Sequence, residues 1–419
     1  MKTLLDTTKL LLPIFIFLLL LSCQKDTINS VSPPVTTPET KETLEIIWQV
    51  PMGVVDTNIY LSNGPAIIKD KIAVGCGKGV QFRNKNSGEF LFLWDDWFGT
   101  AFNHSQRVQV LDQNVFVNSQ IKTYLIDSQN GQTIWKHIIE HGATYSNITF
   151  GNIYHGTRDK SNLFNDFSFL TELDKNTGKR DTIYTVAKVN SYEPGIQPPA
   201  GWINSTGDSL LIFLVRSLDF GGTLDEQLDI YAYNLTADSI EWQLIDYDID
   251  GSARVGPPLV EDDMVYISGK NTLYCLNAAD GSLVWQHRFE DHTDGFTESL
   301  FISAIIKVGN RLVISPTNSN TYCFDAFTGK QLWKKTDSAS SPQNMVHHKG
   351  IIYTVGQGNG KLFAIDLETG EHYWRENPPN YRRDSRAGFF NEIALDPETG
   401  YIYADDRFFV LCIKPYERE

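Results

Sequence analysis

The chain has 419 residues, of which 41% are hydrophobic, and a formal charge of −15. This acidic balance argues against nucleic acid as a partner, because phosphates need a basic face, and it disfavours docking on anionic lipid head groups. The length normally suggests two or three domains, but a closed array of repeats can use it as one.

The first residues resemble a bacterial targeting segment. A basic N-terminus precedes the apolar run Leu10–Leu21, which is too short to span a bilayer and is typical of a signal peptide. The run ends in the sequence Leu-Leu-Ser-Cys at Cys23, which resembles a lipobox. The resemblance implies cleavage after residue 22 and lipidation of the Cys23 thiol. Because Gln24 follows, it also implies anchoring at the outer membrane, on either its periplasmic or its outer face.

A tether and a single strand follow. Residues 23–43 are rich in Thr, Ser and Pro, a composition that predicts a disordered linker between the lipid and a folded domain. Leu44–Val50, LEIIWQV, then predicts a strand that carries a Trp. This strand resembles the last strand of a repeat whose first three strands are missing.

A repeated hairpin pattern organises the rest of the chain. It is clearest in Asn271–Phe289 and returns in Lys122–His137, Asn320–Lys335 and Lys361–Glu376. In each copy an Asp or Asn stands four residues before a Gly, and a Trp follows four residues after that Gly. The Asp side chain can start a turn, and the Gly supplies the positive φ that the turn needs. The Trp can dock between neighbouring sheets and bury roughly 200 Å².

The count of these repeats predicts the fold. Weaker copies occur, one with Thr182 in place of the Trp and one, Asn234–Trp242, without the Gly. The last copy, Ile393–Pro415, stops before any Trp strand, so Leu44–Val50 can complete it and close a ring without exposed edges. We therefore expect an all-β, eight-bladed β-propeller of four-stranded antiparallel blades, with residues 44–419 as a single domain.

The cysteines are expected to be structural. Cys275 and Cys323 hold the same repeat position, and Cys412 is expected to hold it too. Equivalent positions in different blades point to different places around a ring. We therefore expect small, unpaired core residues rather than disulfides.

The repeats also carry a family resemblance. LNAADGSLVW, FDAFTGKQLW and IDLETGEHYW resemble the repeats of quinoprotein-type (PQQ-like) β-propellers. Together with the lipobox, eight such blades are similar to the BamB-type propeller lipoproteins of the outer-membrane β-barrel assembly machinery. The resemblance covers Leu44 to the C-terminus and implies the fold. It does not imply one function, because this fold hosts both enzymes and scaffolds.

The loops between blades are the expected binding face, since loops on a rigid scaffold commonly carry function. Aromatic rings and arginines, which protein interfaces favour, mark this face at Trp97, Phe98, Trp202, Tyr381, Arg382, Arg383, Arg386, Phe389 and Phe390. Two alternatives remain open. The rings can instead close the propeller mouth by packing on one another. The arginines can either grip a carboxylate or an acidic partner or lie in a solvated loop paired with Asp384.

Other motifs give little chemistry. Asp246–Gly251 matches the first half of a calcium loop, but Pro257 stands where the ligating Glu is required. Two Gly-rich stretches, GCGKG and GQGNG, precede strands rather than helices and are expected to be turns. We find no pattern of metal ligands and no nucleophile signature, so we predict no cofactor, no metal and no catalytic residue.

The function expected from the sequence is that of a non-catalytic, lipid-anchored scaffold in the cell envelope. Its expected partners are envelope proteins, among them β-barrel assembly components, bound by a monomeric propeller. A surface lipoprotein that binds polysaccharide through stacked rings is the alternative. A quinoprotein dehydrogenase is the third candidate, although the chain lacks the adjacent Cys pair that alcohol-oxidising members carry over the quinone.

Overall fold

The computed structural model describes residues 44–52, 63–76, 79–96, 108–118, 122–138, 143–158, 166–219, 226–247, 257–269, 271–289, 302–340 and 344–418. The chain separates into two units, Met1–Thr40 and Lys41–Glu419, and every described residue belongs to the second. The predicted signal peptide, Cys23 and the predicted tether lie outside the described residues.

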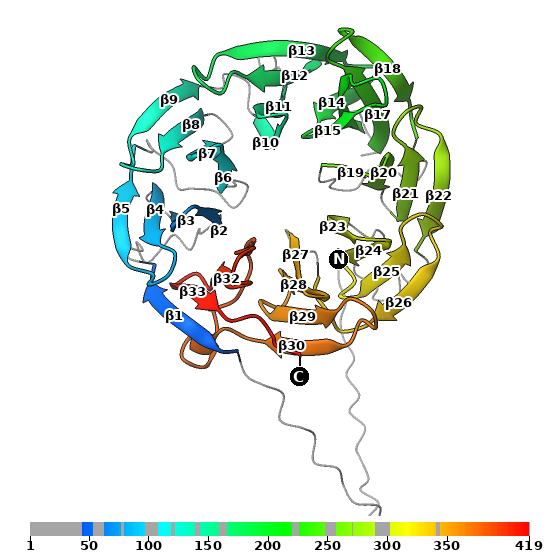
Figure 1. The fold of residues 1–419 in the computed structure, drawn as a ribbon. Helices are drawn as coiled ribbons and strands as arrows, with labels where there is room; N and C mark the ends of the chain where they lie inside the picture. Colours follow the sequence, from blue (N-terminus) through cyan, green and yellow to red (C-terminus); the bar gives the residue numbers. More distant parts are fainter. Residues whose placement is uncertain are drawn as a thin grey trace, which may run out of the picture. The chain divides into compact units, whose positions relative to one another are not determined.

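The described strands form eight antiparallel sheets arranged as the blades of a ring (Figure 1). Blades 1 to 3 are β2 (Asn63–Ile68), β3 (Lys71–Cys76), β4 (Gly79–Asn84) and β5 (Phe90–Trp94); β6 (Val108–Leu111), β7 (Asn114–Asn118), β8 (Lys122–Asp127) and β9 (Thr133–Ile138); and β10 (Ala143–Thr149), β11 (Asn152–Arg158), β12 (Phe167–Leu173) and β13 (Arg180–Ala187). Blades 4 and 5 are β14 (Tyr192–Ile196), β15 (Ala200–Ile203), β16 (Ser209–Asp219), β17 (Glu226–Asn234) and β18 (Ser239–Leu244); and β19 (Leu259–Glu261), β20 (Met264–Ser268), β21 (Thr272–Asn277) and β22 (Leu283–Arg288). Blades 6 to 8 are β23 (Ile302–Val308), β24 (Arg311–Pro316), β25 (Thr321–Asp325) and β26 (Gln331–Lys335); β27 (Met345–His348), β28 (Ile351–Val355), β29 (Leu362–Asp366) and β30 (His372–Glu376); and β31 (Ala394–Leu395), β32 (Ile402–Asp405), β33 (Phe409–Ile413) and β1 (Ile46–Pro51).

Both ends of the described chain build blade 8. The N-terminal strand β1 pairs with β33, with Trp48 opposite Cys412, and it forms the outermost strand of that sheet. In each blade the chain runs from the innermost to the outermost strand (Figure 1). The predicted eight-bladed propeller and its closure by the N-terminal strand are confirmed.

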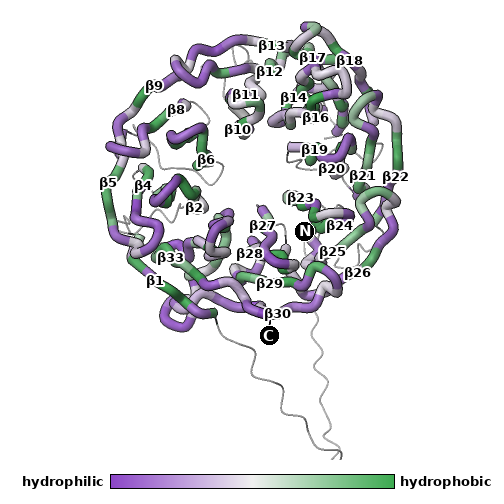
Figure 2. The backbone as a smooth tube through the Cα atoms, in the orientation of Figure 1, coloured by the Kyte–Doolittle hydropathy of each residue, from purple (hydrophilic) through white to green (hydrophobic). Residues whose placement is uncertain are grey.

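Apolar side chains fill the spaces between neighbouring blades. Between blades 5 and 6, for example, Tyr266, Leu273 and Trp285 pack with Leu312 and Tyr322. Hydrophobic and hydrophilic stretches alternate along the chain around the whole ring (Figure 2), because strands buried on both faces alternate with solvated turns. The four cysteines of the described region, including Cys275 and Cys323, are buried and free, as predicted.

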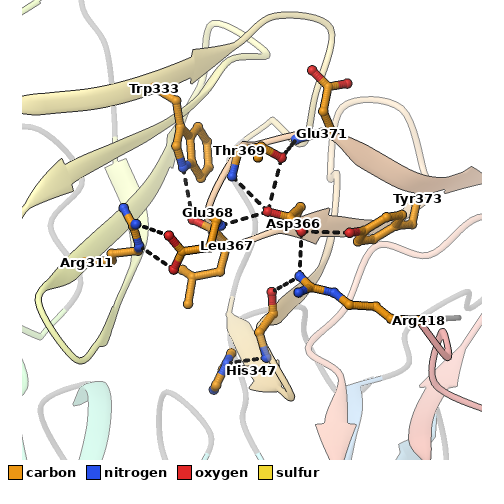
Figure 3. Close-up of polar contacts among 11 residues, drawn as sticks. Arg311, Trp333, His347, Asp366, Leu367, Glu368, Thr369, Glu371, Tyr373 and Arg418 are labelled. Carbon is orange, nitrogen blue, oxygen red and sulfur yellow. Dashed lines mark hydrogen bonds and ion pairs between the residues drawn. The ribbon is translucent and has the colours of Figure 1, made fainter.

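Five of the described tryptophans each dock on a glycine of the next blade. The Trp285 indole Nε1 donates a hydrogen bond to the Ala326 carbonyl oxygen at 2.8 Å. Its ring lies so close to Gly329 that a Cβ there would come within 2.6 Å of the indole, and Gly329 has a φ of 69°. Figure 3 shows the corresponding bond, 3.0 Å long, from Trp333 to the Leu367 carbonyl oxygen. The same ring-on-glycine contact joins Trp48 to Gly88, Trp135 to Gly178, Trp242 to Gly281 and Trp333 to Gly370.

Blades 3 and 4 meet through a different contact. Thr182 replaces the Trp of blade 3, and the corresponding turn of blade 4 has Asp238, with a φ of 54°, instead of Gly. Tyr184 instead lies among the rings of blade 4, with its centroid 6.1 Å from Phe213 and 5.6 Å from Tyr233. With no indole to accommodate, the turn has no need for a residue without a Cβ.

The C-terminal segment modifies the contact between blades 7 and 8. The buried Trp374 ring lies edge-on to Tyr416, and its Nε1 has no hydrogen-bond acceptor among the described residues. The ring that covers Gly400 of blade 8 is that of His348. Arg418 forms an ion pair with Asp366 and donates a hydrogen bond to the Gly350 carbonyl oxygen (Figure 3). The C-terminal segment therefore helps to hold blade 8 against blade 7.

A buried histidine interrupts the apolar contact between blades 2 and 3. His155 on β11 lies opposite Thr171 of the neighbouring strand. The residue at the equivalent position of blade 6 is Ile314, which lies opposite Tyr322. It is fully buried, and neither ring nitrogen has a hydrogen-bond partner among the groups that the structure describes. Burial, with a smaller contribution from the Arg180 charge, lowers the pKa of His155 from 6.5 to about 3.

Replacing Trp285 by Ala is expected to lower the free energy of unfolding by about 3–5 kcal/mol, because a cavity opens between two blades and the indole hydrogen bond is lost. Urea denaturation measures the change. Leu283→Ala is the control, since Leu283 lies on the same strand with 49% of its surface exposed, and it should change stability little. Equal losses in both variants would contradict the docking account.

Replacing His155 by Ile, the residue at the equivalent position of blade 6, is expected to stabilise the protein increasingly as the pH falls. The folded-state pKa of about 3 lies below the ordinary 6.5, so the unfolded chain takes up the proton more readily. The wild type therefore loses stability as the pH drops from 6.5 toward 3. Melting temperatures across this range measure the difference. Parallel curves for the two proteins would show that His155 does not titrate with unfolding.

Candidate functional site

The loops that follow the outer strands share one face of the ring with the loops between second and third strands. On this loop face the connection from β30 to β31, residues 377–393, is described in full and contains the short 3-10 helix η1 (Pro379–Arg382). We call residues 377–393 the arginine loop. The predicted site residues Trp97 and Phe98 lie outside the described residues.

Two buried carboxylates hold the arginine loop. Asp405 and Asp406, at the turn between β32 and β33, are 2% and 0% exposed. The Asn380 amide donates to Asp406 Oδ2 at 2.7 Å. The Asn391 amide donates to both oxygens of Asp405, at 2.9 and 3.1 Å. Because all four residues are buried, these bonds fix both ends of the loop to blade 8.

The Asp406 carboxylate has its own network. Burial raises its pKa, and this effect is opposed by the hydrogen bond from Asn380 and by those from the backbone N–H groups of Phe409 and Phe408. The two backbone bonds are 2.7 and 3.0 Å long. A buried acid with three donors is an anchor, since losing any one donor leaves part of its desolvation cost unbalanced.

Backbone hydrogen bonds shape the middle of the loop. The Arg383 and Asp384 N–H groups both donate to the Asn380 carbonyl oxygen, at 2.9 and 3.0 Å. Further along, the Phe389 N–H donates to the Gly360 carbonyl oxygen at 2.8 Å. This bond joins the arginine loop to the turn that links β28 and β29, where GQGNG forms the turn expected from its glycines.

The two phenylalanines of the loop differ. Phe389 is fully buried and belongs to the core cluster between blades 7 and 8, so our expectation that its ring is part of a binding face is corrected. Phe390 is half-buried and packs on Gly360 and Gly388, where a Cβ would come within 2.8 and 2.2 Å of its ring. The Arg407 guanidinium lies over the Phe390 ring, 4.3 Å from its centroid.

Arg386 pairs with Asp384, which is one of the two alternatives that the sequence left open for the arginines. Its guanidinium donates to both oxygens of Asp384 and lies 5.7 Å from the centroid of the Phe408 ring. These hydrogen bonds lower the pKa of Asp384 to about 2. This arginine therefore does not offer an unshared charge.

Three other arginines carry a charge that no described carboxylate shares. Arg382 and Arg383 are exposed and Arg407 is half-buried, and none of them forms an ion pair with a residue that the structure describes. Tyr381, 41% exposed, lies beside them on η1. The hydrogen bond from Asn380 to Asp406 brings η1 to the turn that carries Arg407. The sequence analysis missed Arg407 and the two aspartates that anchor the arginine loop, because the stretch ADDRFF looks like an ordinary turn between two strands.

Trp202 lies elsewhere. The segment that carries Trp202, which we expect to be a loop between blades, contains β14 and β15, and both of these strands pair with the long strand β16. Trp202 on β15 is half-buried, and its Nε1 donates to Asp263 Oδ1 at 3.0 Å. Asp263 belongs to the hairpin turn between β19 and β20, on the tight-turn face opposite the arginine loop. The placement of Trp202 on the binding face is therefore corrected.

The described residues offer no metal site. Within the described ranges, no three His, Cys, Asp or Glu side chains come together to hold an ion. Of the half calcium loop at Asp246–Gly251, only Asp246 and Tyr247 are described. No helix in the part of the chain that was searched has the length and apolar character needed to cross a membrane.

Comparisons with known proteins agree on the repeat. The family model described as "Outer membrane protein assembly factor BamB" matches residues 226–302 and 295–376. A protein of that name from Francisella salina is 35% identical over 75 residues, which are 18% of this chain and 14% of that protein. A polyvinylalcohol dehydrogenase from a Pseudomonas species is 22% identical over 191 residues, 38% of this chain and 30% of that protein. The crystal structure of BamB from Moraxella catarrhalis aligns with a TM-score of 0.56 at 15% identity, covering 89% of this chain and 100% of that one.

These matches confirm the resemblance to PQQ-like, BamB-type propeller repeats. The chain matches only 14% and 30% of the length of the two curated relatives. The likeness to the Moraxella structure shows the fold, and one of the relatives is named as an enzyme.

Asn380→Ala is expected to loosen the arginine loop, because the buried Asp406 loses the hydrogen bond that its desolvation requires. The cost should be about 1–3 kcal/mol. Hydrogen exchange of the loop amides is expected to become faster, whereas the amides of β20 and β21 keep their rates. Asn176→Ala, in an exposed turn of blade 3, is the control. Unchanged exchange in the arginine loop would mean that Asn380 is not an anchor.

Proposed function

We propose that this protein is a lipid-anchored scaffold of the cell envelope that binds proteins through its loop face and takes part in outer-membrane protein assembly. The matches to a family model and to a Francisella protein that are both named as an outer-membrane protein assembly factor support this role. The Leu-Leu-Ser-Cys sequence at Cys23 supports the anchor.

The observation that carries the proposal is the arginine loop. It is held by buried side-chain hydrogen bonds from Asn380 and Asn391 and presents Tyr381, Arg382 and Arg383 at the surface. Tyr and Arg are the residue types that dominate protein interfaces. A surface that is already ordered binds a partner with little further loss of conformational entropy.

An oxidoreductase role is favoured by the polyvinylalcohol dehydrogenase relative, and a quinone is the cofactor that the quinoprotein resemblance implies. The alcohol-oxidising members carry an adjacent Cys pair over that group. Here the described cysteines Cys76, Cys275, Cys323 and Cys412 are buried in four different blades. These residues do not fit the group, and we derive no redox step.

Site-specific photo-crosslinking in the native cells tests the scaffold role. A photoreactive residue at Arg383 is expected to capture envelope proteins, with β-barrel assembly components among them, by mass spectrometry. The same residue at Lys330, exposed on the tight-turn face, is the control and should not capture them. A Cys23→Ala variant should leave the membrane fraction.

Two results would contradict the scaffold role. One is the capture of the same proteins from both positions, which indicates non-specific contact. The other is the capture of nutrient-uptake porins with glycan-degrading enzymes, which would favour polysaccharide binding instead.

A further inference from the structure

We propose that Arg382, Arg383 and Arg407 form a docking site for a short acidic segment of a partner protein. The inference rests on the proposed scaffold function and names the chemistry of the partner. These three arginines lie in two segments of the loop face that are joined by the hydrogen bond from Asn380 to Asp406.

The charge distribution singles out this place. Elsewhere in the described chain, four arginines each have their charge balanced by a carboxylate of the same molecule. The pairs are Arg216–Glu226, Arg311–Glu368, Arg375–Asp337 and Arg418–Asp366. Within the arginine loop, the half-buried carboxylate of Asp384 is already occupied by Arg386. The remaining guanidinium groups keep their donors for an external carboxylate, which an arginine can bind through two parallel hydrogen bonds.

The site is preformed rather than assembled on binding. Asp405 and Asp406 fix both ends of the loop. Arg407, with a φ of 78°, is stacked on Phe390, which in turn packs on Gly360 and Gly388. The stacking limits the rotamers of a long side chain, so less entropy is lost when it binds an anion.

The charge of the whole chain selects the occupant. With a formal charge of −15, the molecule repels an extended anionic surface such as a membrane or a lipopolysaccharide layer. A short segment can reach a local cluster of arginines without meeting the acidic remainder. The exposed Tyr381 ring offers apolar contact beside the charges, which suits a peptide with both acidic and aromatic residues better than a free phosphate.

The test measures binding of a fluorescein-labelled peptide of Glu, Phe and Ser by fluorescence anisotropy. The wild type is expected to bind it, and added salt should weaken the binding. The Arg382→Glu, Arg383→Glu double variant should bind at least about tenfold more weakly. The matched control is Lys179→Glu, Lys330→Glu, which makes the same change in net charge at two exposed turns of the opposite face and should stay within about twofold of the wild type. Because the four replaced side chains are exposed, both variants should fold, and their melting temperatures verify this.

Four results would overturn the proposal: no binding by the wild type; equal binding of a peptide with Gln in place of Glu; equal losses in both double variants; or competition by inorganic phosphate or anionic vesicles at lower concentration than the peptide. The crosslinking experiment separates this proposal from the scaffold role. If Arg383 captures assembly proteins but the peptide does not bind, the scaffold stands and the acidic-segment site fails. If the peptide binds but no envelope protein is captured, the proposed function fails.

Discussion

The contact between a tryptophan ring and a glycine of the next blade is the constraint on which the ring depends. It demands Gly for two reasons, a positive φ in the turn and the absence of a Cβ under the indole, as at Gly329 beneath Trp285. The two residues are about forty positions apart in sequence, so each blade is specified partly by its neighbour. At the boundary between blades 3 and 4 the Trp and the Gly are lost together, since Thr182 and Asp238 stand in their places. Tyr184 and its aromatic neighbours then supply the packing.

A ring built from repeats needs a different solution where the chain closes on itself. Blade 8 takes its outermost strand from the N-terminal end of the described chain, and Trp48 on that strand docks on Gly88 in the usual way. On its other side, blade 8 meets blade 7, where the C-terminal segment lies against Trp374 through Tyr416. Arg418 then joins this segment to Asp366, the residue that starts the turn of blade 7. Blade 8, in which the ring closes, is therefore held to both of its neighbours by segments near the two ends of the described chain.

The fold could be predicted because its determinants are local and repeated. The spacing of Asn277, Gly281 and Trp285 identifies a hairpin without any knowledge of its neighbours. The candidate site could be predicted only in part. Phe389 and Phe390 are adjacent in one loop, yet one ring is in the core and the other is under Arg407, and no local pattern distinguishes them. Trp202 was misplaced because β16 is eleven residues long and pairs with two short strands in succession, a departure from the repeat that its composition does not reveal.

Buried acids and exposed arginines have complementary roles in this molecule. Carboxylates such as those of Glu368 and Glu371 are exposed, and the formal charge of −15 repels other anions. At the arginine loop the arrangement is reversed, because Asp405 and Asp406 are buried as acceptors for asparagine amides while the neighbouring arginines face outward. Neutral amide donors hold these carboxylates without consuming a guanidinium, so the cationic groups stay available. Had Arg382 or Arg407 supplied the anchoring bonds instead, the loop would be equally well tied but would present no charge to a partner. The choice of asparagine as the anchor is thus what allows one short loop to be both rigid and basic on an otherwise acidic propeller.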